Sequence, residues 1–169
     1  MAEKKLKLIL DTDPGVDDTV CLIYALFDKK AKVELITTVS GNVNIDKATR
    51  NILHLIDLLG VNVPVAKGAK KPLKRKSVNA EFIHQVSGLG GYTPPETTRT
   101  KVLEEDAVSA MYRVIMDGNG DVYPVMLGPQ TNIAKLIKKH PEVIPKIPKI
   151  VIMGGSPYGA PGYPDHISF

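Results

Sequence analysis

Four carboxylates lie within eight residues near the start of the chain, in the motif DTDPGVDD. They are Asp11, Asp13, Asp17 and Asp18. The octet contains no Lys or Arg, so the folded chain must protonate some of these groups, expose them to water or place a cation among them. Apolar residues on both sides of the octet argue against exposure to water. We therefore expect a divalent-metal site.

Each carboxylate taken singly also has an ordinary structural explanation. Asp13 could cap the following helix with Pro14 as its first residue, and Asp11 could be a buried orienting group. Asp17 or Asp18 could be an acid favoured by the helix dipole. Capping explains one carboxylate and not four, so a metal or catalytic role is favoured for the set. Oxygen ligands without His or Cys favour Ca²⁺ or Mg²⁺, and such an ion beside a carboxylate base promotes hydrolysis.

Short apolar runs alternate with longer amphipathic ones, which is typical of an α/β fold with an open, mostly parallel sheet flanked by helices. The expected strands are Leu6–Leu10, Val33–Val39, Val63–Ala66, Val122–Leu127 and Ile150–Met153. The expected helices are Val16–Phe27, Asp46–Leu59, Glu105–Met116 and Thr131–Lys138. Between them, Lys67–Thr100 is rich in Gly, Pro and charge and predicts an irregular insertion with one short helix at Ala80–His84. No repeat or linker interrupts the 169 residues, so we expect a single domain.

Polar residues follow several of the expected strands, at the edge of a parallel sheet where ligands usually bind. The acidic octet follows the first strand, Asn42 the second and Thr131 the fourth, while Met153 ends the last. Each has an alternative: Asn42 in a Gly-Asn turn, Thr131 at a helix start, and Met153 in the core. His84 precedes a glycine-rich stretch and is either ligand-facing or a surface histidine.

Composition excludes several classes of function. The net charge of +4 comes largely from a run of Lys and Arg between residues 67 and 76, which contains no aromatic residue and predicts a solvated loop rather than a nucleic-acid surface. The single cysteine, Cys21 in an apolar stretch, excludes an intramolecular disulfide and fits the reducing cytoplasm. No signal peptide or apolar run of about 18 to 20 residues is visible, so we expect no membrane partner.

The segment Leu8–Asp18 resembles the signature of the nucleoside hydrolases, the inosine-uridine preferring N-ribohydrolase family. Further segments resemble family segments in the family's order: Thr37–Asn42, Thr49–Asn51, Pro64–Gly68, Leu127–Asn132 and Val151–Gly155. The resemblance implies a Rossmann-like core and hydrolysis of the N-glycosidic bond of ribonucleosides to ribose and free base, through an oxocarbenium-like transition state. It also implies Ca²⁺ as cofactor, a small-molecule ribonucleoside as substrate and association into a homo-oligomer.

The resemblance further implies a metal site with assigned ligands. Asp13 and Asp18 would ligate Ca²⁺, with the backbone carbonyl of Thr131 as a further ligand. Asp13 would also be the catalytic base that takes a proton from water. Asp11 would support the metal ligands from behind.

A second group of implied roles concerns the substrate. Asp17 would bind a ribose hydroxyl, and Asn42 would help to hold the ribose and the attacking water. Met153 would line the sugar pocket. His84 corresponds to a family histidine near the base pocket, although the residues after it depart from the family pattern.

Other departures from the family affect its C-terminal part, which the chain is expected to lack. A further aspartate ligand, a histidine for leaving-group activation and a ribose-binding asparagine have no candidates here, and Gly162 and Ser168 fall near positions where the family has an asparagine and a glutamate. We therefore expect an incomplete fold with weak or absent activity.

Two alternatives to catalysis by a nucleoside hydrolase site stay open. One is a non-catalytic homologue that binds metal or ribose. The other is a phosphatase of the haloacid dehalogenase type, because Asp11-Thr12-Asp13 resembles its nucleophile motif, although Gly15 does not fit the pattern.

Overall fold

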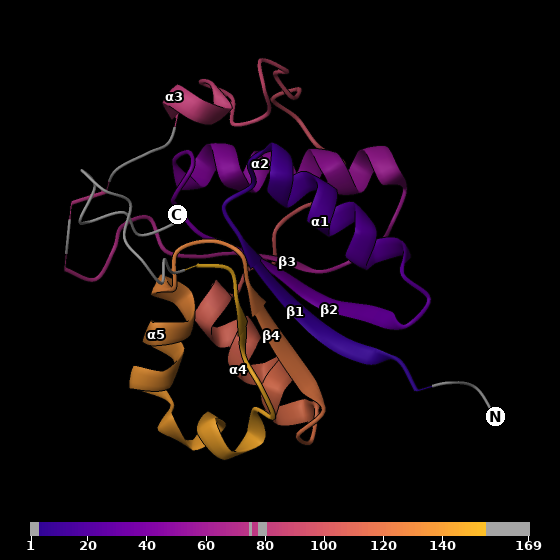
Figure 1. Ribbon diagram of the computed structural model, residues 1–169, viewed down its shortest axis with the longest axis vertical. Coiled ribbons are helices and arrows are strands. Elements are labelled where there is room, and N and C mark those ends of the chain that lie inside the picture. The colour runs from indigo at the N-terminus through magenta and orange to yellow at the C-terminus, as the bar shows by residue number, and fades with distance from the viewer. Residues whose placement is uncertain (1–3, 75, 78–80, 155–169) are drawn as a thin grey trace, which may run out of the picture.

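The computed structural model describes residues 4–154 except 75 and 78–80, so the predictions for Gly162 and Ser168 lie outside the described residues. Five strands form one sheet in the order β3-β2-β1-β4-β5, and every neighbouring pair is parallel (Figure 1). The strands are β1 (Leu6–Thr12), β2 (Ala31–Thr38), β3 (Val65–Lys67), β4 (Val122–Met126) and β5 (Val151–Ile152). The predicted parallel α/β fold is confirmed.

Helices cover both faces of the sheet. They are α1 (Val16–Phe27), α2 (Ile45–Leu59), α3 (Glu81–His84), α4 (Ala107–Asp117), α5 (Thr131–Lys139) and the 3₁₀ helix η1 (Pro141–Lys146). Alternating residues of β1 reach the two faces: Ile9 packs in the core with α4 and α5, and Leu10 packs in the core with α1 and α2. In β2, Leu35 and Ile36 divide in the same way. The sheet is therefore buried on both sides at its centre.

Local signals explain where the helices begin and end. Asn44 caps α2 by accepting hydrogen bonds from the backbone N–H groups of Asp46 and Lys47, and Gly60 ends that helix with φ +64°. Asp106 caps α4 by accepting from the N–H of Ser109, so α4 begins two residues later than predicted. Only η1 was not predicted, because the prolines at its start and within it also indicate loops.

One difference in strand length matters for function. β1 extends two residues beyond the predicted Leu10, because Asp11 and Thr12 continue the ladder opposite Thr37 and Thr38 of β2. The first carboxylate of the octet therefore belongs to the central strand. A carboxylate in this place has its position set by the strands on both sides.

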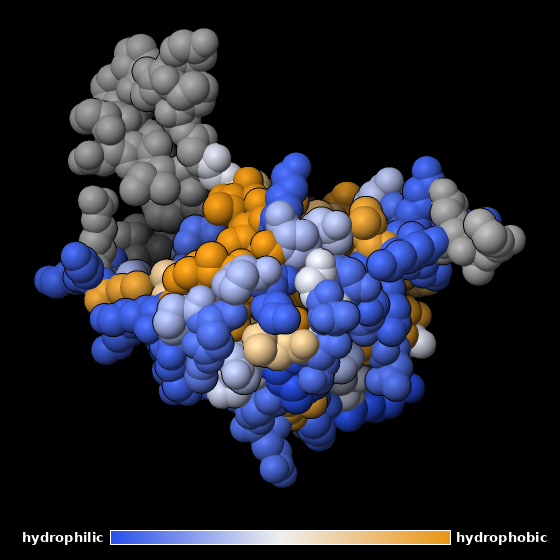
Figure 2. Space-filling view, turned by 90° about the horizontal axis from the view of Figure 1, so that it is seen from below, coloured by the Kyte–Doolittle hydropathy of each residue, from blue (hydrophilic) through white to orange (hydrophobic). Residues whose placement is uncertain are grey.

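The edge of the sheet formed by β5 is much shorter and less buried than the centre. β5 has two residues and, within the described part of the chain, pairs only with β4. Val151, Ile152 and Met153 are exposed there, as is Ile144 of η1. In the view from below, the largest group of hydrophobic side chains forms a band across the left and upper centre, with smaller groups elsewhere on a mostly hydrophilic face (Figure 2). The sheet thus has a well-packed centre and an open apolar edge.

Candidate active site

The four carboxylates of the octet separate into three buried groups and one exposed group. Asp11, Asp13 and Asp18 are 0%, 1% and 3% exposed, whereas Asp17 lies on the exposed side of the first turn of α1. The expectation that the cluster avoids solvent is therefore right for three of the four. Asp17 is the exception, because residues 17 and 18 point to different sides of a helix.

Asp13 lies between two loops that approach it very closely. Its Oδ2 accepts a hydrogen bond of 2.8 Å from the backbone N–H of Asn42, and the Asn42 side chain donates to the Asp13 carbonyl at 3.0 Å. A Cβ atom on Gly41 would fall 1.9 Å from Oδ2, and one on Gly128 would fall 2.7 Å from Oδ1. Only glycines let these two loops, after β2 and β4, enclose the carboxylate. Its Oδ1 is buried without a hydrogen-bond partner.

Asp18 holds the turn that joins β1 to α1. Its Oδ1 accepts from the Thr12 hydroxyl at 2.7 Å, and its Oδ2 accepts from the backbone N–H of Gly15 at 3.0 Å. The Asn42 amide also donates to Oδ2, at 3.4 Å. Gly15 is the N-cap of α1, so the alternative in which Asp13 caps the helix is wrong, and Asp18 makes the capping contact instead.

Asp11 is fully buried and is held through one carboxylate oxygen. Its Oδ1 accepts from the Thr37 hydroxyl at 2.5 Å and from the Asn132 amide at 2.7 Å. The Asn132 amide also donates to the carbonyl of Thr38, and its Oδ1 accepts from the N–H of Ala69. Asn132 thus connects β1, the end of β2 and the loop after β3. Asp11 Oδ2 is buried without a partner.

Three residues of this network were not among the predicted site residues: Thr12, Thr37 and Asn132. Thr12 ends β1, Thr37 lies one residue before the end of β2, and Asn132 is in the first turn of α5, next to the predicted Thr131. Polar residues at the ends of otherwise apolar strands are the signal that could have identified Thr12 and Thr37. Their role is to hold carboxylates in place through hydrogen bonds.

The electrostatics of the cluster are unfavourable without a cation. Burial raises the pKa of Asp13 to about 8, and the nearby charge of Asp18 adds to the rise. Burial also raises the pKa of Asp11 to about 7 and raises the pKa of Asp18. A positive ion at the site would favour the ionised forms.

The donor set suits a hard divalent ion, because two buried carboxylate oxygens, Asp11 Oδ2 and Asp13 Oδ1, lack partners. Within residues 4–154, apart from the gaps, no group of three His, Cys, Asp or Glu side chains is arranged to hold a metal. An ion here would therefore need other oxygen donors as well.

The remaining predicted residues lie at different distances from this cluster. Thr131 is buried and begins α5, beside Asn132. His84 lies at the rim: a Cβ on Gly15 would come within 2.8 Å of its ring and 2.9 Å of Asp17 Oδ1. Met153 follows β5, two strands away from β1, and is 40% exposed. It belongs to the open edge of the sheet.

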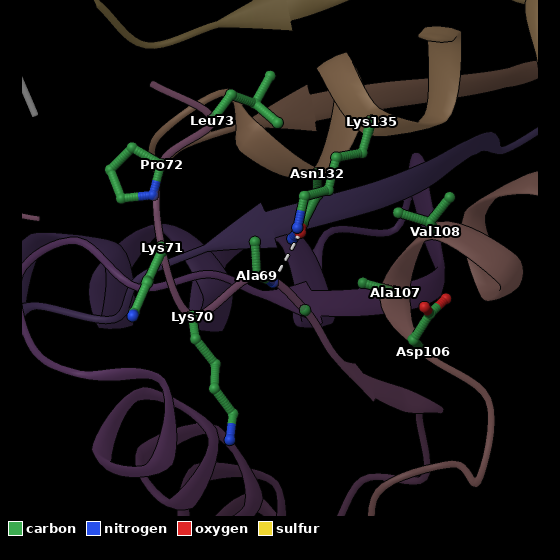
Figure 3. Close-up of a pocket in the computed structure, with 11 residues that line it drawn as sticks. Ala69, Lys70, Lys71, Pro72, Leu73, Asp106, Ala107, Val108, Asn132 and Lys135 are labelled. Atoms are coloured by element: carbon green, nitrogen blue, oxygen red, sulfur yellow. Dashed lines mark hydrogen bonds between the residues drawn. The ribbon is translucent and has the colours of Figure 1, made fainter. Parts of the chain in front are cut away.

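A basic pocket lies on the other side of Asn132, with a volume of about 570 Å³. Lys70, Lys71 and Lys135 line it, together with the start of α4 at Asp106. Figure 3 shows that these lysine side chains point in different directions and do not converge on one point. This arrangement agrees with the prediction that the lysine-rich run is solvated.

Comparison with known proteins decides the family. Residues 8–162 match the family model described as "Inosine-uridine preferring nucleoside hydrolase". The chain belongs to this nucleoside hydrolase family. Over 152 residues it is 43% identical to the non-specific ribonucleoside hydrolase RihC of Escherichia fergusonii and 41% identical to RihC of Klebsiella pneumoniae. Each match covers 90% of this chain and 50% of the relative, so the chain spans about half the length of these curated relatives.

Solved structures of nucleoside hydrolases have the same fold. The purine-preferring ribonucleoside hydrolase from Gardnerella vaginalis superposes with a TM-score of 0.83 at 39% identity, over 89% of this chain and 49% of that one. The plant nucleoside hydrolase PpNRh1 gives 0.82 at 33% identity, over 89% and 48%. The described fold of this nucleoside hydrolase chain therefore corresponds to about half of each structure.

Proposed function

We propose that the acidic cluster is the metal and catalytic site of a Ca²⁺-dependent nucleoside hydrolase, which cleaves the N-glycosidic bond of ribonucleosides to give ribose and free base. The observation that carries the proposal is the set of three buried carboxylates, two of them with an unpartnered oxygen, at the strand ends of a nucleoside hydrolase fold. Carboxylates buried in this way need a cation or protons to be stable.

In this proposal Asp13 and Asp18 hold the ion, together with the backbone carbonyl of Thr131. Bound Ca²⁺ would supply the positive charge that keeps these carboxylates ionised and acidifies water at the site. Asp13 would take a proton from the attacking water on Oδ1, the oxygen left free by the hydrogen bond from Asn42 to Oδ2. Asp11 would support this arrangement through Asn132 and Thr37.

The ribonucleoside would bind on the open side of the cluster. Asp17, exposed at the first turn of α1, is suited to accept hydrogen bonds from a ribose hydroxyl. Asn42 would contact both the ribose and the water, and His84 beside Gly15 would border the base. Met153, 40% exposed at the β5 edge, would line the sugar pocket. We also retain the cytoplasm as the proposed location. No helix within the described residues has the length and apolar character needed to cross a membrane.

A second candidate function is metal or ribose binding without turnover. It is favoured by one observation: within the described residues, no three Asp, Glu, His or Cys side chains are arranged to hold a metal ion together. Fewer anionic ligands weaken Ca²⁺ binding, so weak or absent activity of this chain by itself is part of our proposal. The phosphatase alternative loses most of its support, because the family match accounts for the same motif.

The test is release of ribose from inosine, uridine and adenosine by the purified chain, with and without a calcium chelator. Asp13→Asn keeps the shape of the side chain but removes the base and one ligand charge, so it should abolish release. Asp46→Asn is the matched control, because Asp46 is an exposed carboxylate paired with Lys67 at the start of α2. Equal loss in both variants would contradict the assigned role of Asp13.

Calcium titration by calorimetry separates the two candidates. Binding with chelator-sensitive ribose release supports the hydrolase, and binding without release supports the non-catalytic homologue. No binding by a folded chain would overturn both. Release of inorganic phosphate from a phosphomonoester would instead support the phosphatase.

A further inference from the structure

Arg50 of α2 carries a charge for which the described chain provides no partner. Its Nε atom is buried without a hydrogen-bond acceptor, and no ion pair between described residues involves its guanidinium group. An unpaired buried N–H group is costly, and native structures contain few of them. The proposed nucleoside site does not use this side chain. An acceptor supplied by a bound ligand would remove the cost.

A cavity of about 260 Å³ lies beside Arg50, between α2 and the chain that follows α3. Figure 1 shows this segment next to α2, and two hydrogen bonds of 2.9 Å tie it there. The Asn51 amide donates to the carbonyl of Ser87, and the Tyr92 hydroxyl pairs with the His54 ring. We call this space the Arg50 cavity. The described residues that line it include no Asp or Glu: Lys47, Arg50, Gln85, Val86, Ser87, Gly91 and Thr93.

The wall of the Arg50 cavity is rich in hydrogen-bond donors. Ser87 is 7% exposed, and its Oγ accepts a hydrogen bond of 3.2 Å from the N–H of Leu89. Within the described residues no acceptor takes the hydroxyl proton of Ser87, so this proton is available to a ligand. Thr93 and Gln85 add a second hydroxyl and an amide. A guanidinium group together with hydroxyl and amide donors suits a phosphate group, whose several oxygens can accept from all of them.

A second cavity, of about 410 Å³, also has Arg50 in its wall but differs in charge. Asp46 and Glu96 line it, and Asp46 forms an ion pair with Lys67 there. An anion would meet two carboxylates in this second cavity and none from the described residues in the Arg50 cavity. The anion is therefore expected on the side of Ser87.

We propose that the Arg50 cavity is a binding site for a phosphate group, with the Arg50 guanidinium as its main ligand. This site goes beyond the proposed nucleoside hydrolysis and does not depend on it. Inorganic phosphate and the phosphate of a nucleotide offer the same chemistry. A bound phosphate would connect α2 to the segment that begins next to His84, which lies at the rim of the acidic cluster.

Titration of the ¹⁵N-labelled chain with inorganic phosphate, followed by NMR, tests the proposal after metal ions have been removed with a chelating resin. Amide shifts should change at Ser87, Gly91 and Thr93. Arg50→Gln should weaken binding at least about tenfold, because a charge-assisted hydrogen bond is lost. Arg50→Lys keeps the charge but not the planar fork and should recover only part of the affinity. A parallel titration with AMP identifies the source: tighter binding than phosphate indicates a nucleotide, and equal binding indicates the phosphate group alone.

Lys70→Gln is the matched control, because Lys70 is an exposed cation that lines a different pocket. It should bind phosphate like the wild type. In buffer without phosphate, Arg50→Gln should keep the unfolding temperature of the wild type, since Arg50 makes no hydrogen bond or ion pair with described residues. No shift changes in the wild type would overturn the proposal. Equal weakening in Arg50→Gln and Lys70→Gln would also overturn it, because the attraction would then be diffuse and not a site.

Discussion

The centre of the sheet and its β5 edge differ in how firmly they hold a side chain. At the centre, β1 is paired on both sides, and each buried carboxylate at its carboxyl end accepts hydrogen bonds from loops or neighbouring strands. At the edge, β5 is two residues long, paired on one side within the described residues, and its apolar side chains are exposed. The comparison teaches that this chain positions its three buried carboxylates by itself. The β5 edge, which includes Met153, needs a further contact to become a wall of a pocket.

The largest expected difference is between matched isoleucines in the two regions. Ile36→Ala removes a side chain that is 1% exposed in β2 and should destabilise the fold by about 3 kcal/mol, through lost burial and a cavity. Ile152→Ala removes one that is 54% exposed in β5 and should change stability by less than about 0.5 kcal/mol. Urea unfolding measures both. Similar losses would mean that the β5 edge is buried in solution.

A smaller effect is expected where the loop after β2 meets Asp13. Gly41→Ala places a methyl group against the carboxylate and should cost about 2 kcal/mol of stability, because backbone and side chain must both move. It should also weaken calcium binding, which calorimetry measures. Gly60→Ala is the control: it meets no atom within 4 Å but is strained at φ +64°, so it should cost about 1 kcal/mol and leave calcium binding unchanged.

Asn132→Ala tests whether the hydrogen-bond network around Asp11 supports the candidate metal site. The change leaves the N–H of Ala69 and one oxygen of Asp11 with fewer partners, and we expect a loss of about 1.5 kcal/mol. Asn44→Ala removes the cap of α2 and should cost about 1 kcal/mol. Only the first should also weaken calcium binding. If both variants bind calcium like the wild type, Asn132 has no supporting role at the site.

The pH dependence of stability should reveal the buried carboxylates. Asp11 and Asp13 have folded-state pKa values of about 7 and about 8 against ordinary values of 3.8, so the folded chain holds more protons than the unfolded chain between these limits. In chelator, the unfolding temperature should therefore fall by a few degrees as pH rises from 5 to 8, and Asp11→Asn should reduce this slope. Differential scanning calorimetry checks both. An unfolding temperature that does not change with pH would show that Asp11 and Asp13 are already ionised or in contact with water in the folded chain.

Much of the fold was predictable because its signals are local. The limits of α1 at Val16 and Phe27 agree with the prediction, and α2 and α5 differ by one residue at one end. Periodic apolar residues and caps act over one or two turns, so a sequence displays them directly. The extension of β1 through Asp11 was not predictable in this way, since it depends on pairing with β2, twenty-six residues farther along the chain for the Thr37 contact.

In the candidate site, too, some features follow from local sequence and others depend on contacts between distant segments. The octet alone indicates a cation site, because four like charges between apolar runs require compensation whatever the fold. The sequence therefore predicted a cation site and, through resemblance, the family, which the comparisons show. Only the tertiary structure decided that Asp17 is exposed, that Gly15 rather than Asp13 is the N-cap of α1, and that Asn132 donates to Asp11. The reason is physical: burial and hydrogen bonding between distant segments are properties of packing, and no local pattern fixes them.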